Sequence, residues 1–143
     1  MSTLEESEQL KELYRLYGIA AHNCCNMEYR IVYLLLGPKW EETEKLNPEK
    51  VPEIFEKLTK LTLGSLLKEY KQHFNLTEQQ LSLAEEVLEK RNYLAHHFFG
   101  NYGKRMHDPK VLEKMTSELK SLIVLFQSVS RSLDPEQWQR KST

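Results

Sequence analysis

The chain has 143 residues, enough for one domain with a sizeable hydrophobic core that needs no metal or disulfide to hold it together. Hydrophobic residues make up 40% of it, which excludes an intrinsically disordered chain. Its 20 Lys and Arg against 21 Asp and Glu leave a net charge of −1, which excludes a protein that coats nucleic acid by bulk positive charge but leaves a local basic site open.

The first expected element is a long helix. Between Leu13 and Leu35 the apolar residues recur in steps of three and four, which is the pattern of one helix face. We predict a helix within residues 1–36 that ends at Gly37-Pro38, because Gly accepts a left-handed cap and Pro lacks the N–H that a helix needs. After a polar connection, short helices are expected within residues 51–73.

The next helix has the clearest start signal in the chain. Thr77 and Gln80 have the spacing of a capping box, in which each side chain bonds to the backbone N–H of the other residue. We predict a helix over residues 77–100 that ends at Gly100.

A last long helix is expected over residues 108–133, followed by a tail over residues 134–143. Asp108 is a good N-cap and Pro109 suits the first helical position. The apolar seam of this helix is Leu112, Met115, Leu119, Leu122, Phe126, Val129 and Leu133. Residues 1–143 are therefore expected to form a single all-α domain, an up-and-down bundle of four to five helices.

Three features predict a cytoplasmic protein with no membrane contact. The longest apolar run, Ile31 to Leu36, is far shorter than the ~20 residues of a membrane span. The first residues lack the basic-then-apolar order of a signal peptide. Cys24 and Cys25 are adjacent in a helical pattern and therefore form a poor disulfide, which suggests a reducing compartment.

The helix over residues 77–100 carries an unusual polar group. Arg91 falls near the middle of its apolar arc, so the guanidinium must pair with a carboxylate, face another subunit or line a cleft. Asn92 and His96 are four positions apart and share one flank. The stretch over residues 90–110 holds five Lys and Arg against one acidic residue, so a nearly neutral chain concentrates positive charge here.

The run Arg91-Asn-Tyr-Leu-Ala-His96 resembles the Arg-polar-x-x-x-His motif of HEPN-domain proteins. The motif of that family lies near the C-terminal end of a helix in a four- or five-helix bundle, and its placement here is similar. The stretch Leu61 to Phe99 also looks like small bacterial members of this group. The resemblance covers about the middle third of the chain by motif and the remainder by the number of helices.

The resemblance implies a homodimeric, metal-independent endoribonuclease with no cofactor. Arg91, Asn92 and His96 would be catalytic: His96 as base or acid, Arg91 as the phosphate ligand and Asn92 as a positioning group. Positions five apart on an α-helix diverge by about 140°, so Arg91 and His96 favour a site composed from two chains. The side chains expected to contact nucleic acid are His97, Tyr102, Lys104, Arg105 and His107.

Non-enzymatic interpretations remain open beside this one. Some HEPN domains bind a nucleotide, nucleic acid or a partner protein without catalysis, and Phe98 stands where toxin members often carry Tyr. Arg91 can form a structural ion pair with Glu28 or Glu12 of the first helix. The histidines can be ordinary C-terminal helix residues, and the basic loop can be a solvated surface.

Two other chemistries are weaker. Cys24 or Cys25 with His22 could form a nucleophile or a metal site, but Cys24 lies in the apolar stripe and is better explained as a core residue. Glu85, Glu86 and Glu89 could bind Mg²⁺ in a metal-dependent nuclease, although a solvated acidic face explains them more simply. No metal site is therefore predicted.

Overall fold

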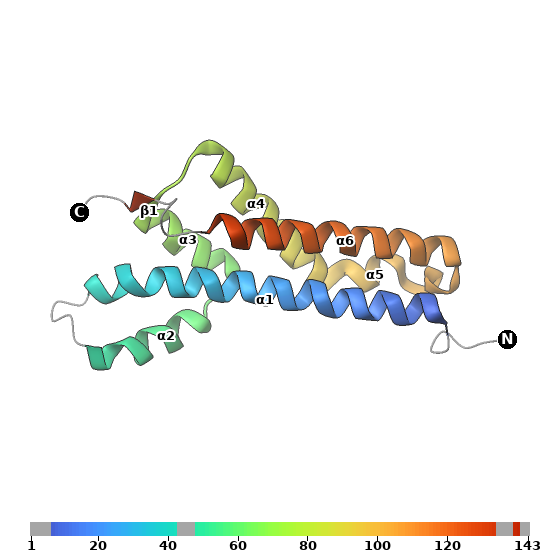
Figure 1. Cartoon of the computed structure of the whole chain (residues 1–143), viewed down its shortest axis with the longest axis horizontal. Coiled ribbons are helices and arrows are strands. Elements are labelled where there is room, and N and C mark those ends of the chain that lie inside the picture. Colours follow the sequence, from blue (N-terminus) through green and yellow to red (C-terminus); the bar gives the residue numbers. More distant parts are fainter. Residues whose placement is uncertain (1–6, 43–47, 134–138, 141–143) are drawn as a thin grey trace.

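The computed structural model describes residues 7–42, 48–133, 139 and 140. Its two longest helices, α1 (Glu8–Glu42) and α6 (Pro109–Ser132), lie side by side and run in the same direction (Figure 1). Gln9 Nε2 donates to the carbonyl of Pro109 at 3.1 Å near one end. Arg30 Nε donates to the carbonyl of Leu133 at 2.9 Å near the other end. These two bonds fix the register of the pair.

Shorter elements connect these two helices, and a short strand follows α6. α2 and α3 run up and down beside α1, and α4 continues through η3 into α5 before the chain turns back into α6 (Figure 1). The expected all-α class is confirmed, and the short helices expected within residues 51–73 are present. In chain order these elements are η2 (Pro48–Lys50), α2 (Val51–Thr59), α3 (Leu63–His73), β1 (Phe74–Asn75), α4 (Glu78–Asn92), η3 (Tyr93–His97), α5 (Phe98–Tyr102), η4 (Gly103–His107) and β2 (Gln139–Arg140). The two short strands pair antiparallel, with Phe74 opposite Arg140.

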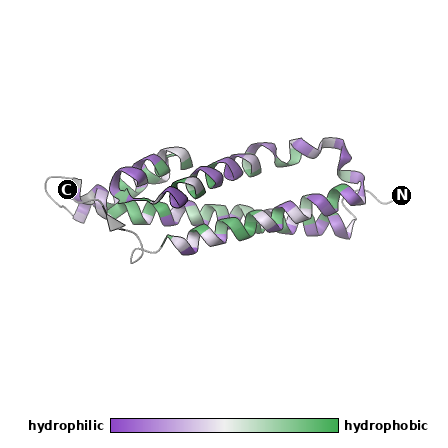
Figure 2. Ribbon diagram, turned by 90° about the horizontal axis from the view of Figure 1, so that it is seen from above, coloured by the Kyte–Doolittle hydropathy of each residue, from purple (hydrophilic) through white to green (hydrophobic). Residues whose placement is uncertain are grey.

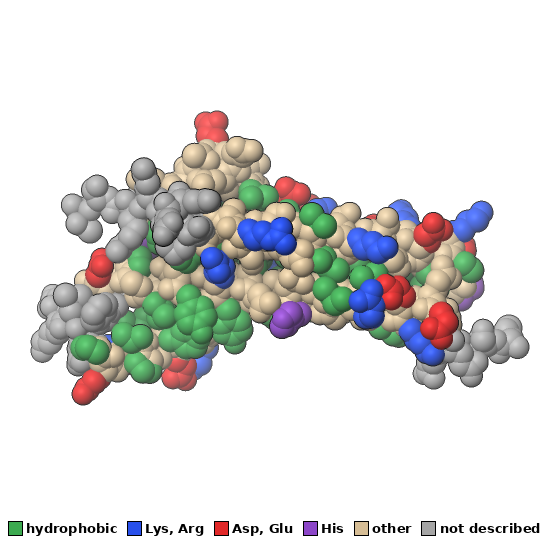
Figure 3. All heavy atoms as spheres, viewed as in Figure 1, with side chains coloured by type: hydrophobic (Ala, Val, Ile, Leu, Met, Phe, Trp, Pro, Cys, Tyr) green, Lys and Arg blue, Asp and Glu red, His purple; other side chains and the backbone are tan. Residues whose placement is uncertain are grey.

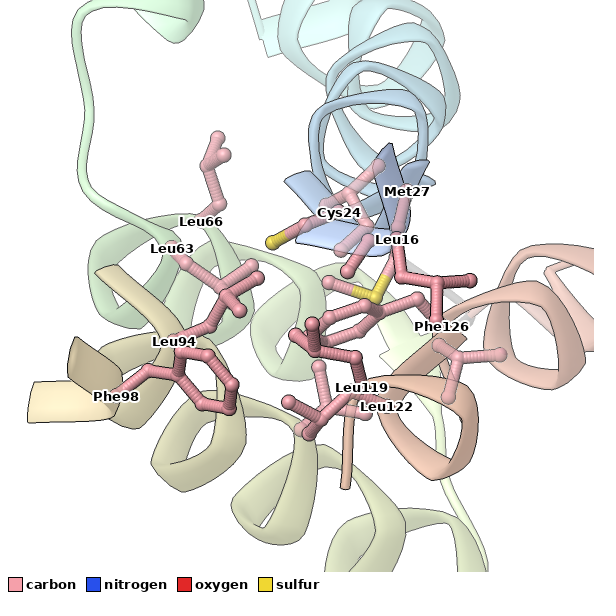
Figure 4. Close-up of a cluster of buried hydrophobic side chains, with 14 of the residues drawn as sticks. Leu16, Cys24, Met27, Leu63, Leu66, Leu94, Phe98, Leu119, Leu122 and Phe126 are labelled. Atoms are coloured by element: carbon pink, nitrogen blue, oxygen red, sulfur yellow. The ribbon is translucent and has the colours of Figure 1, made fainter. Parts of the chain in front are cut away.

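The core runs along the axis of the bundle, where the hydrophobic sides of the helices meet (Figure 2). All seven residues of the predicted α6 seam are buried, and Phe126 and Leu119 are 0% exposed. Side chains from α1, α3, η3, α5 and α6 converge there, among them Met27, Leu66 and Phe98 (Figure 4). Each large side chain buried in this way contributes about 1.5–3 kcal/mol of transfer free energy.

The predicted end of the first helix at Gly37-Pro38 is wrong. α1 continues through both residues to Glu42. Gly37 does not form the expected left-handed cap, since Gly103 is the one glycine with positive φ among the described residues. Pro38 has no N–H for the carbonyl four residues back, a loss that costs about 3 kcal/mol within a helix. Packing offsets this cost, because Pro38 is buried and Lys39 Nζ pairs with Glu69 Oε2 of α3 at 2.5 Å.

The predicted helix over residues 77–100 begins as expected and ends differently. Its capping box is present, with Thr77 Oγ1 accepting from the N–H of Gln80 at 3.1 Å and Gln80 Oε1 accepting from the N–H of Thr77 at 2.8 Å. Gly100 does not end it. Regular α-helix stops at Asn92, a wide π-helical turn follows, and the helix ends at Tyr102, before Gly103 with φ +51°.

The last helix begins at Pro109, as predicted. Asp108 caps it, and its side chain accepts from the N–H of Lys110 at 2.9 Å. The predicted tail lies outside the described residues except for Gln139 and Arg140. None of the helices in the described part of the chain has the length and apolar character to cross a membrane.

Candidate functional site

The motif spans the end of α4, which carries Arg91 and Asn92, and the wide turn η3, which carries His96. There the N–H of Phe98 donates to the carbonyl of Tyr93, five residues back, rather than to that of Leu94 as in a regular α-helix. The carbonyl of Leu94 therefore loses its usual donor. The Tyr17 hydroxyl of α1 replaces that donor, with its oxygen 3.0 Å from the carbonyl oxygen of Leu94. A side chain 77 positions away in sequence thus satisfies a backbone group that the wide turn releases.

Aromatic packing holds the same turn against α1. The Tyr17 ring lies 5.8 Å from the ring of Phe98 and 4.8 Å from that of Phe99, measured between centroids. Phe98 is 1% exposed, and the Tyr93 ring meets its edge at 6.0 Å. Aromatic pairs at such distances add about 0.5–1.5 kcal/mol beyond their buried area. The wide turn is therefore fixed by hydrogen bonding and by packing.

Arg91 forms the ion pair that the sequence left open. Its Nε donates to Oε1 of Glu28 at 3.0 Å, and the side chains of Arg91 and Glu28 are 31% and 25% exposed. Its Nη1 makes a long contact of 3.5 Å with Oδ1 of Asn92. Nη2 makes no hydrogen bond to any residue that the structure describes. The guanidinium is thus held by one carboxylate and remains partly exposed.

His96 and Asn92 are both exposed. On a regular α-helix, side chains five positions apart point about 140° away from each other. The wide turn contains an extra residue and therefore reduces this divergence between Arg91 and His96. His97 is also exposed, with its ring centroid 6.4 Å from that of His96. Both imidazoles are accessible to a ligand from solution.

Cys24 lies beside the Glu28 carboxylate, inside the core. It is 6% exposed, and its Sγ is 3.9 Å from Oε1 of Glu28. Burial first, and then the negative charge of Glu28, raise the pKa of the Cys24 thiol to about 12. A thiol that stays protonated is a poor nucleophile, which supports the interpretation of Cys24 as a core residue. Cys25 and His22 are exposed on α1, and both cysteines are free.

Tyr102 does not have the exposed position that a nucleic-acid contact requires, so this part of the predicted site is wrong. Its side chain is 3% exposed and packs edge-on against Phe98 at 5.9 Å. Gly103 allows this outcome, because the helix continues past Gly100 and turns Tyr102 into the bundle. Helical periodicity contained this signal, since Tyr102 is four positions after the core residue Phe98.

The rest of the basic loop divides into two parts. Arg105 uses its donors within the fold: Nε bonds the carbonyl of Tyr102 at 3.3 Å and Nη2 bonds the carbonyl of Asn101 at 2.7 Å. It therefore caps the C-terminal end of α5. Lys104 and His107 are exposed on the short helix η4, where His107 Nδ1 contacts the carbonyl of Lys104. These two side chains remain available to a phosphate.

A polar network that the sequence did not predict lies on the other side of the wide turn. Tyr93 donates its hydroxyl to Oε2 of Glu118 on α6 at 2.8 Å, and Asn101 Nδ2 lies 3.5 Å from the same hydroxyl. Burial and the Glu118 carboxylate raise the pKa of both Tyr93 and Tyr102. A groove of about 570 Å³ opens beside it between α4 and α6.

Acidic side chains at this groove include Glu86 and Glu89, which are exposed like Glu85. Within the described ranges, no group of three or more His, Cys, Asp or Glu side chains has the arrangement of a metal site. The solvated-face interpretation of these three glutamates is the one that their exposure supports.

Comparisons with protein-family models, with curated proteins and with solved structures each find no match to this chain.

Proposed function

We propose that this chain is a HEPN-like endoribonuclease that acts as a homodimer and cleaves RNA without a metal ion. The observation that carries the proposal is the wide turn between Arg91 and His96. Such turns occur frequently at functional sites, because they reorient side chains at the expense of regular hydrogen bonding. Here the turn carries the exposed imidazole of His96 and directly follows the partly exposed guanidinium of Arg91 and the exposed amide of Asn92.

The chemistry follows from these three groups. A neutral His96 takes the proton of the ribose 2′-hydroxyl, whose oxygen attacks phosphorus and forms the new P–O bond. The P–O5′ bond breaks, and the 5′-oxygen takes a proton from water, whose hydroxide then takes the proton that His96 holds. The second copy supplies the Arg91 that faces this imidazole. Arg91 donates to the phosphate oxygens as their negative charge increases, and Asn92 orients the phosphate or the imidazole. The products are a 2′,3′-cyclic phosphate and a 5′-hydroxyl end.

Glu28 positions Arg91 in this scheme. It binds Nε, so the guanidinium plane is fixed while the terminal nitrogens remain for the phosphate. The proposal includes a cytoplasmic location, which the free and exposed Cys25 supports because exposed thiols persist in reducing compartments.

The same ion pair favours a second candidate, a HEPN-like module that binds a nucleotide, nucleic acid or a partner protein without catalysis. Glu28 already neutralises Arg91, so the guanidinium offers a phosphate less net charge than a free one would. Phe98 is buried and brings no hydroxyl to the site. In this alternative, Arg91 joins α4 to α1 and the exposed flank is a binding surface.

Cleavage of single-stranded RNA in EDTA separates the two candidates. We expect His96→Ala to lose about 10²–10⁴-fold in rate, since His96 acts as the general base. Arg91→Ala should also lose activity, whereas His22→Ala, which removes an exposed histidine of α1, should cut as the wild type does. Wild-type protein that binds RNA without cutting it selects the binding module. Activity in His96→Ala equal to that of the wild type rules out the nuclease.

A further inference from the structure

A second groove lies between α1 and α6, on a different side of α1 from the motif. Its volume is about 740 Å³, in the range of small-ligand sites, and it is open to solvent. Figure 3 shows the face on which α1 and α6 lie together. The described residues that line the groove are Asn23, Asn26, Tyr29, Arg30, Tyr33, Leu34, Gln127, Ser130 and Arg131.

This groove is positively charged in a nearly neutral chain. Two of its described lining residues, Arg30 and Arg131, are basic and none is acidic. The neighbouring helices reinforce this bias: α6 has no acidic residue after Glu118, and Glu28 is the one acidic residue of α1 between Leu13 and Lys39. Glu28 faces Arg91 of α4, away from the groove. The groove therefore attracts an anion, and none of its described lining residues is a carboxylate that would compete for the guanidinium groups.

The two arginines keep donors for a ligand. Arg30 uses Nε to bond the carbonyl of Leu133, which orients its planar group at the end of α6. Its terminal nitrogens make no bond to a described residue. Arg131 is exposed and makes no ion pair with any residue in the described ranges. A guanidinium that is oriented but unsatisfied is suited to a phosphate group.

Aromatic rings stand at the edge of the same groove. Tyr29 and Tyr33 are 50% and 61% exposed, and both rest on Phe55 of α2, with ring centroids 6.5 Å and 5.4 Å away. This packing holds one side of the rings while a large part of each ring remains in water. A positive groove with exposed aromatic rings is the combination that binds single-stranded nucleic acid, since phosphates meet the cations and bases stack on the rings.

We propose that this groove binds a segment of single-stranded RNA. Arg30 and Arg131 hold phosphates, Tyr29 and Tyr33 stack on bases, and Gln127 offers an amide to a base edge. The inference deepens the proposed function and rests on it, because it names a surface that holds the substrate away from the scissile bond. Glu28, which pairs with Arg91 of the motif, and Arg30, which lines the groove, point about 200° apart on a helix about 10–12 Å across. A strand bound in the groove therefore passes around α1, or onto the second copy, to reach a motif.

Binding of a fluorescent 2′-O-methyl oligonucleotide, which has no 2′-hydroxyl to attack its own phosphates, tests this surface by anisotropy over a salt series. We expect Arg131→Gln to weaken binding and to reduce the slope of log K against log salt by about 0.7, the value for one phosphate contact on a single strand. Tyr33→Ser should weaken binding about tenfold through lost stacking. Lys120→Gln, with the same loss of charge on α6 outside the groove, should bind as the wild type does.

Several results would overturn the proposal. The groove is not the RNA site if Arg131→Gln and Tyr33→Ser both bind as tightly as Lys120→Gln, or if the wild type fails to bind the strand at low salt. It is a contact between copies if Arg131→Gln changes the mass in solution and leaves RNA binding unaltered. Failure of the nuclease is a separate result, because a wild type that cuts no RNA can still bind the inert strand through this groove.

Discussion

The last helix, α6, and the motif helix, which comprises α4, η3 and α5, differ in the regularity of their hydrogen bonding, although both line the same core. α6 keeps its hydrogen bonding over 24 residues, and its apolar seam alternates in steps of three and four to the end. The motif helix gives up regular bonding after Asn92 and uses Tyr17 of another helix to satisfy a carbonyl. Packing alone explains α6, whereas the motif helix carries an irregularity that a side chain of another helix supports. We infer that function accounts for the difference.

The largest expected effect is on α6. Phe126→Ala should lower the free energy of unfolding by about 3–5 kcal/mol, because the ring is 0% exposed and its removal leaves a cavity. Urea denaturation measures this loss. Val124→Ala on the same helix is the control: Val124 is 62% exposed, so its change should stay within about 0.5 kcal/mol. Equal effects of the two substitutions would mean that the seam does not face the core.

The wide turn is tested by Tyr17→Phe, which keeps the ring and removes the donor to Leu94. We expect a loss of about 1 kcal/mol in unfolding free energy, the contribution of one partly buried hydrogen bond. Tyr14→Phe is the matched control, since Tyr14 also meets Phe99, at 6.2 Å, and is 53% exposed. If the two variants are equally stable, the Tyr17 hydroxyl does not support the turn.

Alkaline pH should weaken the fold next to the motif. The folded chain keeps a proton on Cys24 up to about pH 12, whereas an unperturbed thiol of pKa 9.0 releases it, so the folded state binds more protons over this interval. Stability therefore falls as pH rises from 9 towards 12, by up to about 1.4 kcal/mol per pH unit from this group. Cys24→Ala should make this decline shallower, and Cys25→Ala should not. Identical pH profiles of the two variants would show that Cys24 titrates normally.

The smallest effect concerns the ion pair that joins the motif to α1. Glu28→Gln should change stability by less than about 1 kcal/mol, because both partners are partly solvated. It should also lower the pKa of Cys24, since the Glu28 charge contributes to raising it. In a Cys25→Ser background, alkylation of Cys24 at pH 9 should become faster. Glu12→Gln, which breaks a surface pair with Arg15, should leave this rate unchanged.

Local patterns predicted a large part of the fold. The α6 seam, the capping box at Thr77 and the cap at Asp108 are set by residues a few positions apart, and all are present. The predicted end of the first helix was wrong, because the actual end depends on the packing of Pro38 and on the partner that Lys39 has in α3. The cost of a proline within a helix can be read from the sequence, whereas the contacts with another helix that offset this cost cannot.

The site was less predictable for the same reason. The ion pair of Arg91 with Glu28 was one of the stated alternatives, because a guanidinium in an apolar arc needs a partner. The wide turn was missed, since the Tyr17 bond that supports it spans 77 positions. The groove between α1 and α6 was missed as well, because counting charge along the chain cannot show that Arg30 and Arg131 line the same groove.

Mixing two inactive variants tests the central claim, a nuclease site composed from two copies, most directly. Arg91→Ala and His96→Ala are each expected to be inactive against single-stranded RNA in EDTA. If one copy supplies Arg91 and the other His96, each mixed dimer keeps one intact site, so an equal mixture should recover about a quarter of wild-type activity. A mixture as inactive as its two components, measured under conditions in which the chains exchange, would contradict the account.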